Sequence, residues 1–324
     1  MQIEVWADVV CAWAYIGKRR LERALAAFDA PAEVVWRPFR IDPAAPVPAD
    51  PMAETLQDPM VNEALRECAP ELTPAENRVR VAQIATEEGL GPRWGAAWRA
   101  NSHEAHRLLA LAYESGGARL QDAVVEGVLR AHFIDGLDIS SSAVLHRLAA
   151  EAGFADGGDL LDTGAGEELV RELALRGRAM GVASSPTLVV NGIALRGAQL
   201  PEAIQVFLHN AAGRTPRPVP EEVERLRLAE SLLDLGDPLG ALTLLRPLLK
   251  EHGDDRGVRL LAARSYFHSA QLNRARQVLE SLAVETPDDS YVQLLLGRVL
   301  QRQGHHEQAA AHLRVAAAMT PVYG

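Results

Sequence analysis

Residues 7–18 read ADVVCAWAYIGK and join an alternating apolar segment to one with helical spacing. Apolar and polar residues alternate over 2–7, which predicts a strand, and apolar residues recur at helical spacing from about residue 12 onward. Cys11 therefore lies where a strand ends and a helix begins. Backbone N–H groups and the helix dipole stabilise a thiolate at such a place, so we expect a lowered pKa and a reactive thiol. The alternative is a buried, inert cysteine that packs as a small apolar side chain.

The predicted elements of residues 1–211 indicate an α/β thioredoxin-like fold with an all-helical insertion at about 53–180. A proline-rich stretch at 42–51 precedes the insertion and predicts an extended loop. The last two strands are joined by Asn191-Gly192, a strong two-residue turn signal. After the first strand and helix, strands are predicted at 34–39, 187–190 and 193–196, and helices at 53–67, 74–89, 93–115, 118–134, 140–152, 165–180 and 199–211.

Residues 221–324 repeat with a period of 34 residues, the period of tetratricopeptide repeats. Small residues recur where two helices of a hairpin approach closely, and Pro or Gly recurs where the second helix ends. We therefore expect three repeats in an all-α solenoid, after a Pro-rich linker at 212–220. The concave face is expected to bind a protein or peptide partner; the alternative is a dimerisation or scaffold module. The aligned positions are Gly236, Ala270 and Gly304; Ala241, Ala275 and Ala309; Leu245, Leu279 and Leu313; and Gly253, Pro287 and Pro321.

Several segments of residues 1–211 resemble FrnE-type members of the DsbA family. Residues 7–18 resemble that family's active-site segment, Cys-Pro-Trp-Cys-Tyr-Ile-Gly. The resemblance implies a thiol–disulfide oxidoreductase with Cys11 as its catalytic residue. It also implies that Pro186 is a cis-proline facing the cysteine, and that the backbone of Ser185 pairs with a substrate peptide. The other matching segments are 36–39, 101–108, 132–139 and 181–187.

Two positions of the motif depart from that family. Ala14 stands where the family has its second cysteine, and Ala12 stands where it has proline. A dithiol attacks with one thiol and releases the product with the other, so Cys11 alone needs an external thiol. Glutathione or mycothiol would serve as that co-substrate, with no tightly bound cofactor. Two alternatives stay open: a thiol-dependent transferase or isomerase like the kappa-class enzymes, and a redox-inactive chaperone or adaptor that keeps the fold for binding.

Other candidate residues each allow two interpretations. Trp13 and Tyr15 either wall a substrate groove or belong to the core of the first helix. His106 matches a family histidine and is a candidate substrate-binding residue, although surface packing or capping is favoured. Cys68 either resolves the mixed disulfide or packs within the helical insertion, and packing is favoured. No histidine or cysteine cluster has the spacing of zinc ligands, so no metal is expected.

Composition narrows the class of partner. The net charge is −10 and no dense stripe of Lys or Arg occurs, which argues against nucleic acid and anionic membrane surfaces as partners. The first residues lack the pattern of a signal peptide, and no long apolar run predicts a membrane span. We therefore expect a cytoplasmic protein, in which a structural disulfide between Cys11 and Cys68 would be unusual. The repeats and the related families are compatible with a homodimer.

Overall fold

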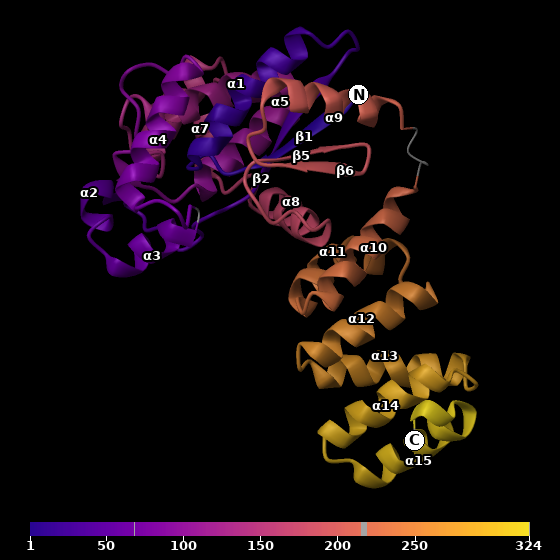
Figure 1. Ribbon diagram of the computed structural model, residues 1–324. Helices are drawn as coiled ribbons and strands as arrows, with labels where there is room; N and C mark the ends of the chain where they lie inside the picture. The colour runs from indigo at the N-terminus through magenta and orange to yellow at the C-terminus, as the bar shows by residue number, and fades with distance from the viewer. Residues whose placement is uncertain (68, 215–218, 324) are drawn as a thin grey trace. The chain divides into compact units, whose positions relative to one another are not determined.

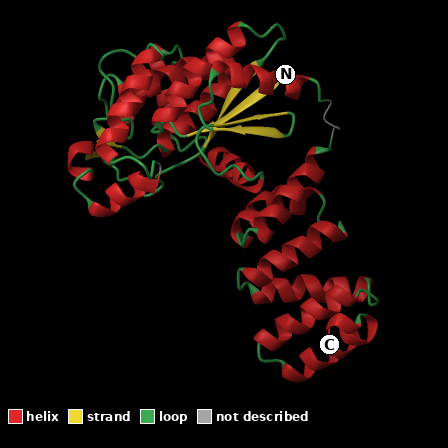
Figure 2. Cartoon of the chain, viewed as in Figure 1, coloured by secondary structure: helices red, strands yellow, loops and turns green. Residues whose placement is uncertain are grey.

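The computed structural model describes residues 1–67, 69–214 and 219–323, and these residues divide into two compact units. The first unit contains residues 1–177 and 182–214, and the second contains 219–323 together with 178–181. Each unit is described by itself (Figures 1 and 2). The predicted linker at 212–220 lies partly outside the described residues, and Cys68 lies outside them.

Four strands of the first unit form one sheet in the order β2-β1-β5-β6 among the described residues. β1 (Gln2–Ala7) pairs parallel to β2 (Glu33–Pro38) and antiparallel to β5 (Thr187–Val190), which in turn pairs with β6 (Ile193–Arg196). The turn between β5 and β6 has positive φ at both Asn191 and Gly192, as the Asn-Gly signal predicts. The thioredoxin-like α/β fold is thus confirmed, with β2 one residue earlier than predicted.

The helical block of the first unit differs from its prediction in three places, whereas the predicted break between 115 and 118 is present as a kink at Gly117 within α5 (His103–Phe133). The helix predicted at 53–67 is two helices, because Asp58 turns the chain and accepts a hydrogen bond from the Met60 N–H at 2.8 Å. The helix predicted at 93–115 begins only at residue 103, because the two-residue strands β3 (Asp50–Pro51) and β4 (Trp98–Arg99) pair with each other. A short helix at 157–162 was not predicted. The helices are α1 (Ala12–Ala26), α2 (Met52–Thr55), α3 (Pro59–Glu67), α4 (Pro74–Glu87), α5 (His103–Phe133), α6 (Ser142–Glu151), α7 (Gly157–Asp162), α8 (Glu167–Ala179) and α9 (Pro201–Ala212).

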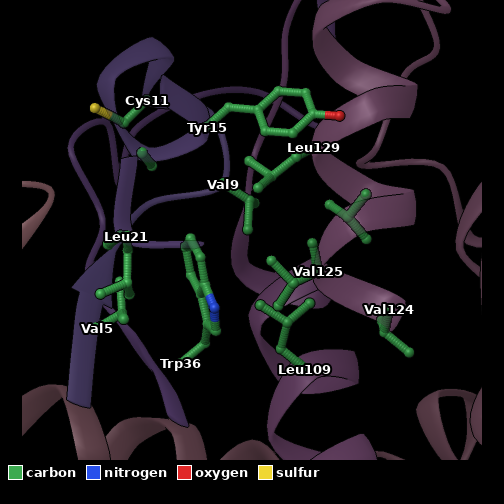
Figure 3. Close-up of a cluster of buried hydrophobic side chains, with 14 of the residues drawn as sticks. Val5, Val9, Cys11, Tyr15, Leu21, Trp36, Leu109, Val124, Val125 and Leu129 are labelled. Carbon is green, nitrogen blue, oxygen red and sulfur yellow. The ribbon is translucent and has the colours of Figure 1, made fainter. Parts of the chain in front are cut away.

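Helix α5 packs against β2 and builds much of the core of the first unit. Figure 3 shows Trp36 of β2 in one cluster with Leu109 and Val125 of α5. Gln121 of α5 is fully buried, and its amide accepts a hydrogen bond from the Trp36 N–H at 2.8 Å and donates one to the Trp36 carbonyl oxygen at 3.0 Å. The edge strand therefore has backbone partners supplied by a side chain, which fixes α5 against the sheet.

The second unit consists of paired helices whose ends explain the 34-residue period. The first helix of each pair ends just before Gly236, Ala270 or Gly304, and all three residues have positive φ. The equivalent residues Ala241, Ala275 and Ala309 are buried in the second helices, where small side chains allow close packing. The predicted helical repeats are thus confirmed. The helices are α10 (Glu221–Asp234), α11 (Pro238–Glu251), α12 (Arg256–His268), α13 (Leu272–Glu285), α14 (Ser290–Arg302) and α15 (His306–Met319), followed by a 3-10 turn at Pro321–Tyr323.

Candidate functional site

Cys11 is the N-cap residue of α1, with extended backbone angles (φ −86°, ψ 116°). Its thiol is free and 8% exposed, and Sγ donates a hydrogen bond to the carbonyl oxygen of Ser185 at 3.5 Å. The peptide bond between Ser185 and Pro186 is cis, as the resemblance implies. Gly17 allows this close packing, because a Cβ there would lie 3.2 Å from Cγ of Pro186. The structure therefore brings Cys11, Ser185 and Pro186 together.

The pKa of the Cys11 thiol is raised, which contradicts the lowered pKa expected from its position. Burial is the main cause, and the negative charge of Asp8 adds to it. The side chain of Ser185 and the backbone N–H groups of Ala14 and Trp13 lower the pKa, but they do not outweigh burial. The N-terminus of the helix thus lowers the pKa of the thiol as expected, but burial and the charge of Asp8 raise it by more.

Asp8 is the buried charge of this site, and its importance was not predicted. Its carboxylate accepts hydrogen bonds from the Ile41 N–H at 2.6 Å and from Nε2 of His106 at 3.2 Å, with the ring nitrogen as donor. Burial alone would raise the pKa of Asp8, but His106 and the Ile41 N–H hold it below its ordinary value, so the carboxylate is ionised. The backbone N–H of Asp8 also donates to Oγ of Ser185 at 2.9 Å. The sequence could have indicated this role, because Asp8 directly follows the first strand and precedes Cys11 by three residues.

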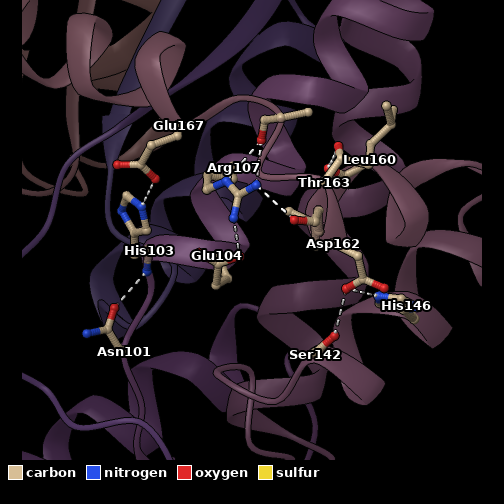
Figure 4. Close-up of polar contacts among 12 residues, drawn as sticks. Asn101, His103, Glu104, Arg107, Ser142, His146, Leu160, Asp162, Thr163 and Glu167 are labelled. Atoms are coloured by element: carbon tan, nitrogen blue, oxygen red, sulfur yellow. Dashed lines mark hydrogen bonds and ion pairs between the residues drawn. The ribbon is translucent and has the colours of Figure 1, made fainter.

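His106 is 2% exposed, which corrects the expectation of a surface histidine. Its ring is held by Asp8, so it does not face the solvent where a substrate would arrive. His103, one turn earlier on α5, instead bonds Glu167 at 2.6 Å (Figure 4). The two histidines therefore have different partners.

The two aromatic residues beside Cys11 have different environments. Tyr15 is buried in the core, where its ring lies near Trp94, with centroids 6.0 Å apart, and its hydroxyl donates to Glu126 at 2.7 Å. Burial and the Glu126 carboxylate raise the pKa of Tyr15. Its predicted role as a wall of the substrate groove is therefore wrong, and the core interpretation holds. Trp13 is half-buried, with the Arg80 guanidinium 6.0 Å from its ring centroid.

The structure offers no candidate metal centre in the ranges it describes, since no group of three or more His, Cys, Asp or Glu side chains converges there. Within the same ranges, no helix is long and apolar enough to cross a membrane.

Comparisons with known proteins find a matching family model for each unit. Residues 2–209 match the family model of the DsbA-like thioredoxin domain, and residues 232–299 match that of the tetratricopeptide repeat. A probable DsbA oxidoreductase from Streptomyces coelicolor is 26% identical to this chain, with a TM-score of 0.55, over 68% of this chain and 94% of its own. A 2-hydroxychromene-2-carboxylate isomerase is 16% identical over 65% of this chain and 94% of its own, with a TM-score of 0.48. The cytosolic disulfide reductase DsbM from Pseudomonas aeruginosa is 20% identical over 65% of this chain and 98% of its own, with a TM-score of 0.43. Among curated proteins there is no match.

Proposed function

Because the chain belongs to the DsbA-like thioredoxin-domain family, we propose that it is a thiol–disulfide oxidoreductase with Cys11 as its single active-site thiol. Within the family we place it with the FrnE-type members, on the motif at residues 7–18. An external small thiol, glutathione or mycothiol, completes each cycle. The requirement for that reduced thiol places the reaction in a reducing compartment, the cytoplasm.

The proposed cycle has two exchange steps. The Cys11 thiolate attacks one sulfur of a client disulfide, a new S–S bond forms to Cys11, and the other client sulfur leaves as a thiolate. A small-molecule thiolate then attacks the client sulfur of this mixed disulfide. Cys11 leaves as a thiolate, and the client carries a mixed disulfide with the small thiol. Trp13 and the backbone of Ser185 are the proposed contacts for the client segment.

The observation that carries the proposal is the Cys11 thiol at the N-terminus of α1, in contact with Ser185 beside the cis bond to Pro186, with only Ala14 one turn further along the helix. A thiol of high pKa is a strong nucleophile once deprotonated and a poor leaving group. The mixed disulfide on Cys11 therefore forms with a client thiol of lower pKa as the leaving group, and it persists until a small thiol attacks it. This favours opening of a client disulfide and capture of the client over oxidation of client thiols.

The proposal is tested by mass spectrometry of the full chain in a Cys68→Ser background, which leaves Cys11 as the only cysteine. After incubation with oxidised glutathione or mycothiol, we expect one adduct at Cys11, removed by excess of the reduced thiol. Cys11→Ser in the same background should give no adduct. Absence of an adduct with both disulfides, at a pH where the thiol is ionised, refutes the proposal.

Substitution of Ala14 tests whether the rest of the site is that of a dithiol enzyme. Ala14→Cys, again with Cys68→Ser, should form an internal disulfide with Cys11 and reduce a protein disulfide over many turnovers with dithiothreitol present. Ala24→Cys, a buried position of α1 further from Cys11, is the matched control and should form no such bond. A variant that keeps two free thiols under oxidation would show that Cys11 and residue 14 cannot be bridged.

The burial of Cys11 also favours a second candidate, a redox-inactive adaptor that keeps the fold for binding. The same variants separate the two. An adaptor keeps its client after Cys11→Ser, whereas an oxidoreductase loses the covalent client complex and keeps only weak association.

A further inference from the structure

The first helices of the three pairs, α10, α12 and α14, contact one another along the second unit. Positions 34 residues apart lie side by side on this face, because Nη1 of Arg264 in α12 is 3.0 Å from a carboxylate oxygen of Glu230 in α10. Nη1 of Arg302 in α14 also donates to the carbonyl oxygen of Phe267, which directly precedes the equivalent position 268 in α12, at 2.9 Å. Two rows of equivalent positions therefore cross this face: 230, 264 and 298, and 234, 268 and 302.

The rows run from acidic residues in α10 to arginines in α14, and only the acidic end has partners of opposite charge. In the first two repeats, Arg264 lies between Glu230, at 3.0 Å, and Asp234, at 3.5 Å. In the third repeat, Arg298 and Arg302 stand one turn apart on α14, and both are exposed. Within the described part of the chain, neither has a carboxylate partner. The positive charge at this end of the face is therefore uncompensated.

The part of the sequence that contains these two arginines also differs in charge from the whole chain. Residues 256–323 contain eight arginines and five acidic residues, although the whole chain has a net charge of −10. Arg302 holds its guanidinium over the half-buried ring of Phe267, 4.8 Å from the ring centroid, which fixes the direction of the charge. A planar guanidinium fixed in this way presents its remaining N–H groups to a carboxylate.

We propose that the face around Arg298 and Arg302, with Phe267 and the exposed His268 beside them, binds an acidic segment of a partner protein. Asp or Glu carboxylates of that segment accept hydrogen bonds from the two guanidinium groups. A short acidic segment needs only this local surface. A long polyanion such as RNA would meet the net negative charge of the chain along many phosphates, so a protein segment is favoured. This inference concerns the second unit and holds whether or not Cys11 reacts.

Peptide binding to the full chain tests the proposal. The probes are a fluorescein-labelled acidic peptide and its analogue in which Asn and Gln replace every Asp and Glu, followed by fluorescence anisotropy at low salt. We expect the acidic peptide to bind about tenfold more tightly than the analogue, and its affinity to fall as salt is added. Equal affinity of the two peptides overturns the proposal. Tighter binding of an oligouridylate of equal length than of the acidic peptide also overturns it, in favour of RNA.

Matched variants locate the binding surface. Arg298→Gln/Arg302→Gln should weaken binding of the acidic peptide about tenfold, since each exposed ion pair contributes modestly. Arg276→Gln/Arg314→Gln removes the same charge from the second helices α13 and α15 and should change the affinity less than about twofold. Because Arg302 packs on Phe267, Arg298→Gln alone serves as a variant that removes no described contact, with a loss of about threefold. Unchanged affinity in Arg298→Gln/Arg302→Gln, with an unchanged circular dichroism spectrum, refutes the assignment.

Discussion

At the scale of single residues, the charge of Asp8 can be removed by one substitution to test what sets the reactivity of Cys11. That charge raises the pKa of the thiol, in addition to burial. Asp8→Asn removes the charge, while the amide oxygen still accepts from the Ile41 N–H. In the Cys68→Ser background, we therefore expect the pH midpoint of Cys11 alkylation by iodoacetamide to move to lower pH, with faster alkylation at neutral pH.

Asp162→Asn is the matched control, because Asp162 is an exposed residue of α7 that bonds His146. It should leave the alkylation midpoint in place. A midpoint that stays or rises in Asp8→Asn would show that the carboxylate does not govern the thiol.

His132 is a second buried residue whose protonation matters, this time for stability. Burial lowers the pKa of His132 to about 4, whereas the unfolded chain has an ordinary histidine pKa of about 6.5. Between about pH 6.5 and pH 4, His132 is protonated in the unfolded chain but neutral in the folded one. Proton binding therefore stabilises the unfolded state, and the free energy of unfolding falls as the pH is lowered from about 6.5 towards 4. The free energy of unfolding should fall by about 2 kcal/mol between pH 7 and pH 5 from this residue.

His132→Leu should remove most of that fall, and His146→Gln, a partly exposed histidine of α6, should retain it. Urea unfolding followed by tryptophan fluorescence is the measurement, since all five tryptophans lie within residues 6–98 and report on the first unit. An equal loss of stability with falling pH in His132→Leu contradicts the assignment.

At the scale of elements, helix α5 depends on one glycine at its kink. Gly117 has φ 66° and ψ −165°, a conformation that side chains rarely adopt, although a Cβ there would have no atom within 4 Å. Gly117→Ala should therefore destabilise the first unit by about 1–3 kcal/mol through backbone strain alone. Gly127 lies in regular helix, and a Cβ there would have its nearest atom at 3.8 Å. Gly127→Ala should therefore stabilise the unit by about 0.5–1 kcal/mol. Urea unfolding by tryptophan fluorescence measures both, and equal signs for the two variants would be inconsistent with this account.

Elements with their own local pattern could be predicted from the sequence. The apolar spacing of α1 and the 34-residue period both depend on residues close together in the chain. The extent of α5 could not be predicted, because Trp98 and Arg99 are drawn into a strand by residues 50–51, far away in the sequence. At the site, the position of Cys11 and the cis bond before Pro186 followed from the motif. The direction of the thiol pKa did not, because burial and Asp8 act through tertiary structure.

At the scale of the whole molecule, the core of the first unit and the core of the later repeats share no residue. The first is built from residues between 3 and 211, and the second from residues between 263 and 309. Chains with separate cores commonly unfold in more than one step. We therefore expect that urea transitions followed by tryptophan fluorescence, which reports on the first unit, and by far-ultraviolet circular dichroism, which reports on all helices, do not coincide.

One core substitution in each unit tests this independence. Leu129→Ala removes a fully buried side chain of α5 and should lower the stability of the first unit by about 2–5 kcal/mol, moving the fluorescence transition. Leu279→Ala removes an equally buried side chain of α13 and should move only a part of the dichroism transition that fluorescence does not report. If Leu279→Ala shifts the fluorescence midpoint as far as Leu129→Ala does, the two units unfold as one. The repeats would then stabilise the domain that carries Cys11, and partner binding to the repeats would raise the stability of that domain as well.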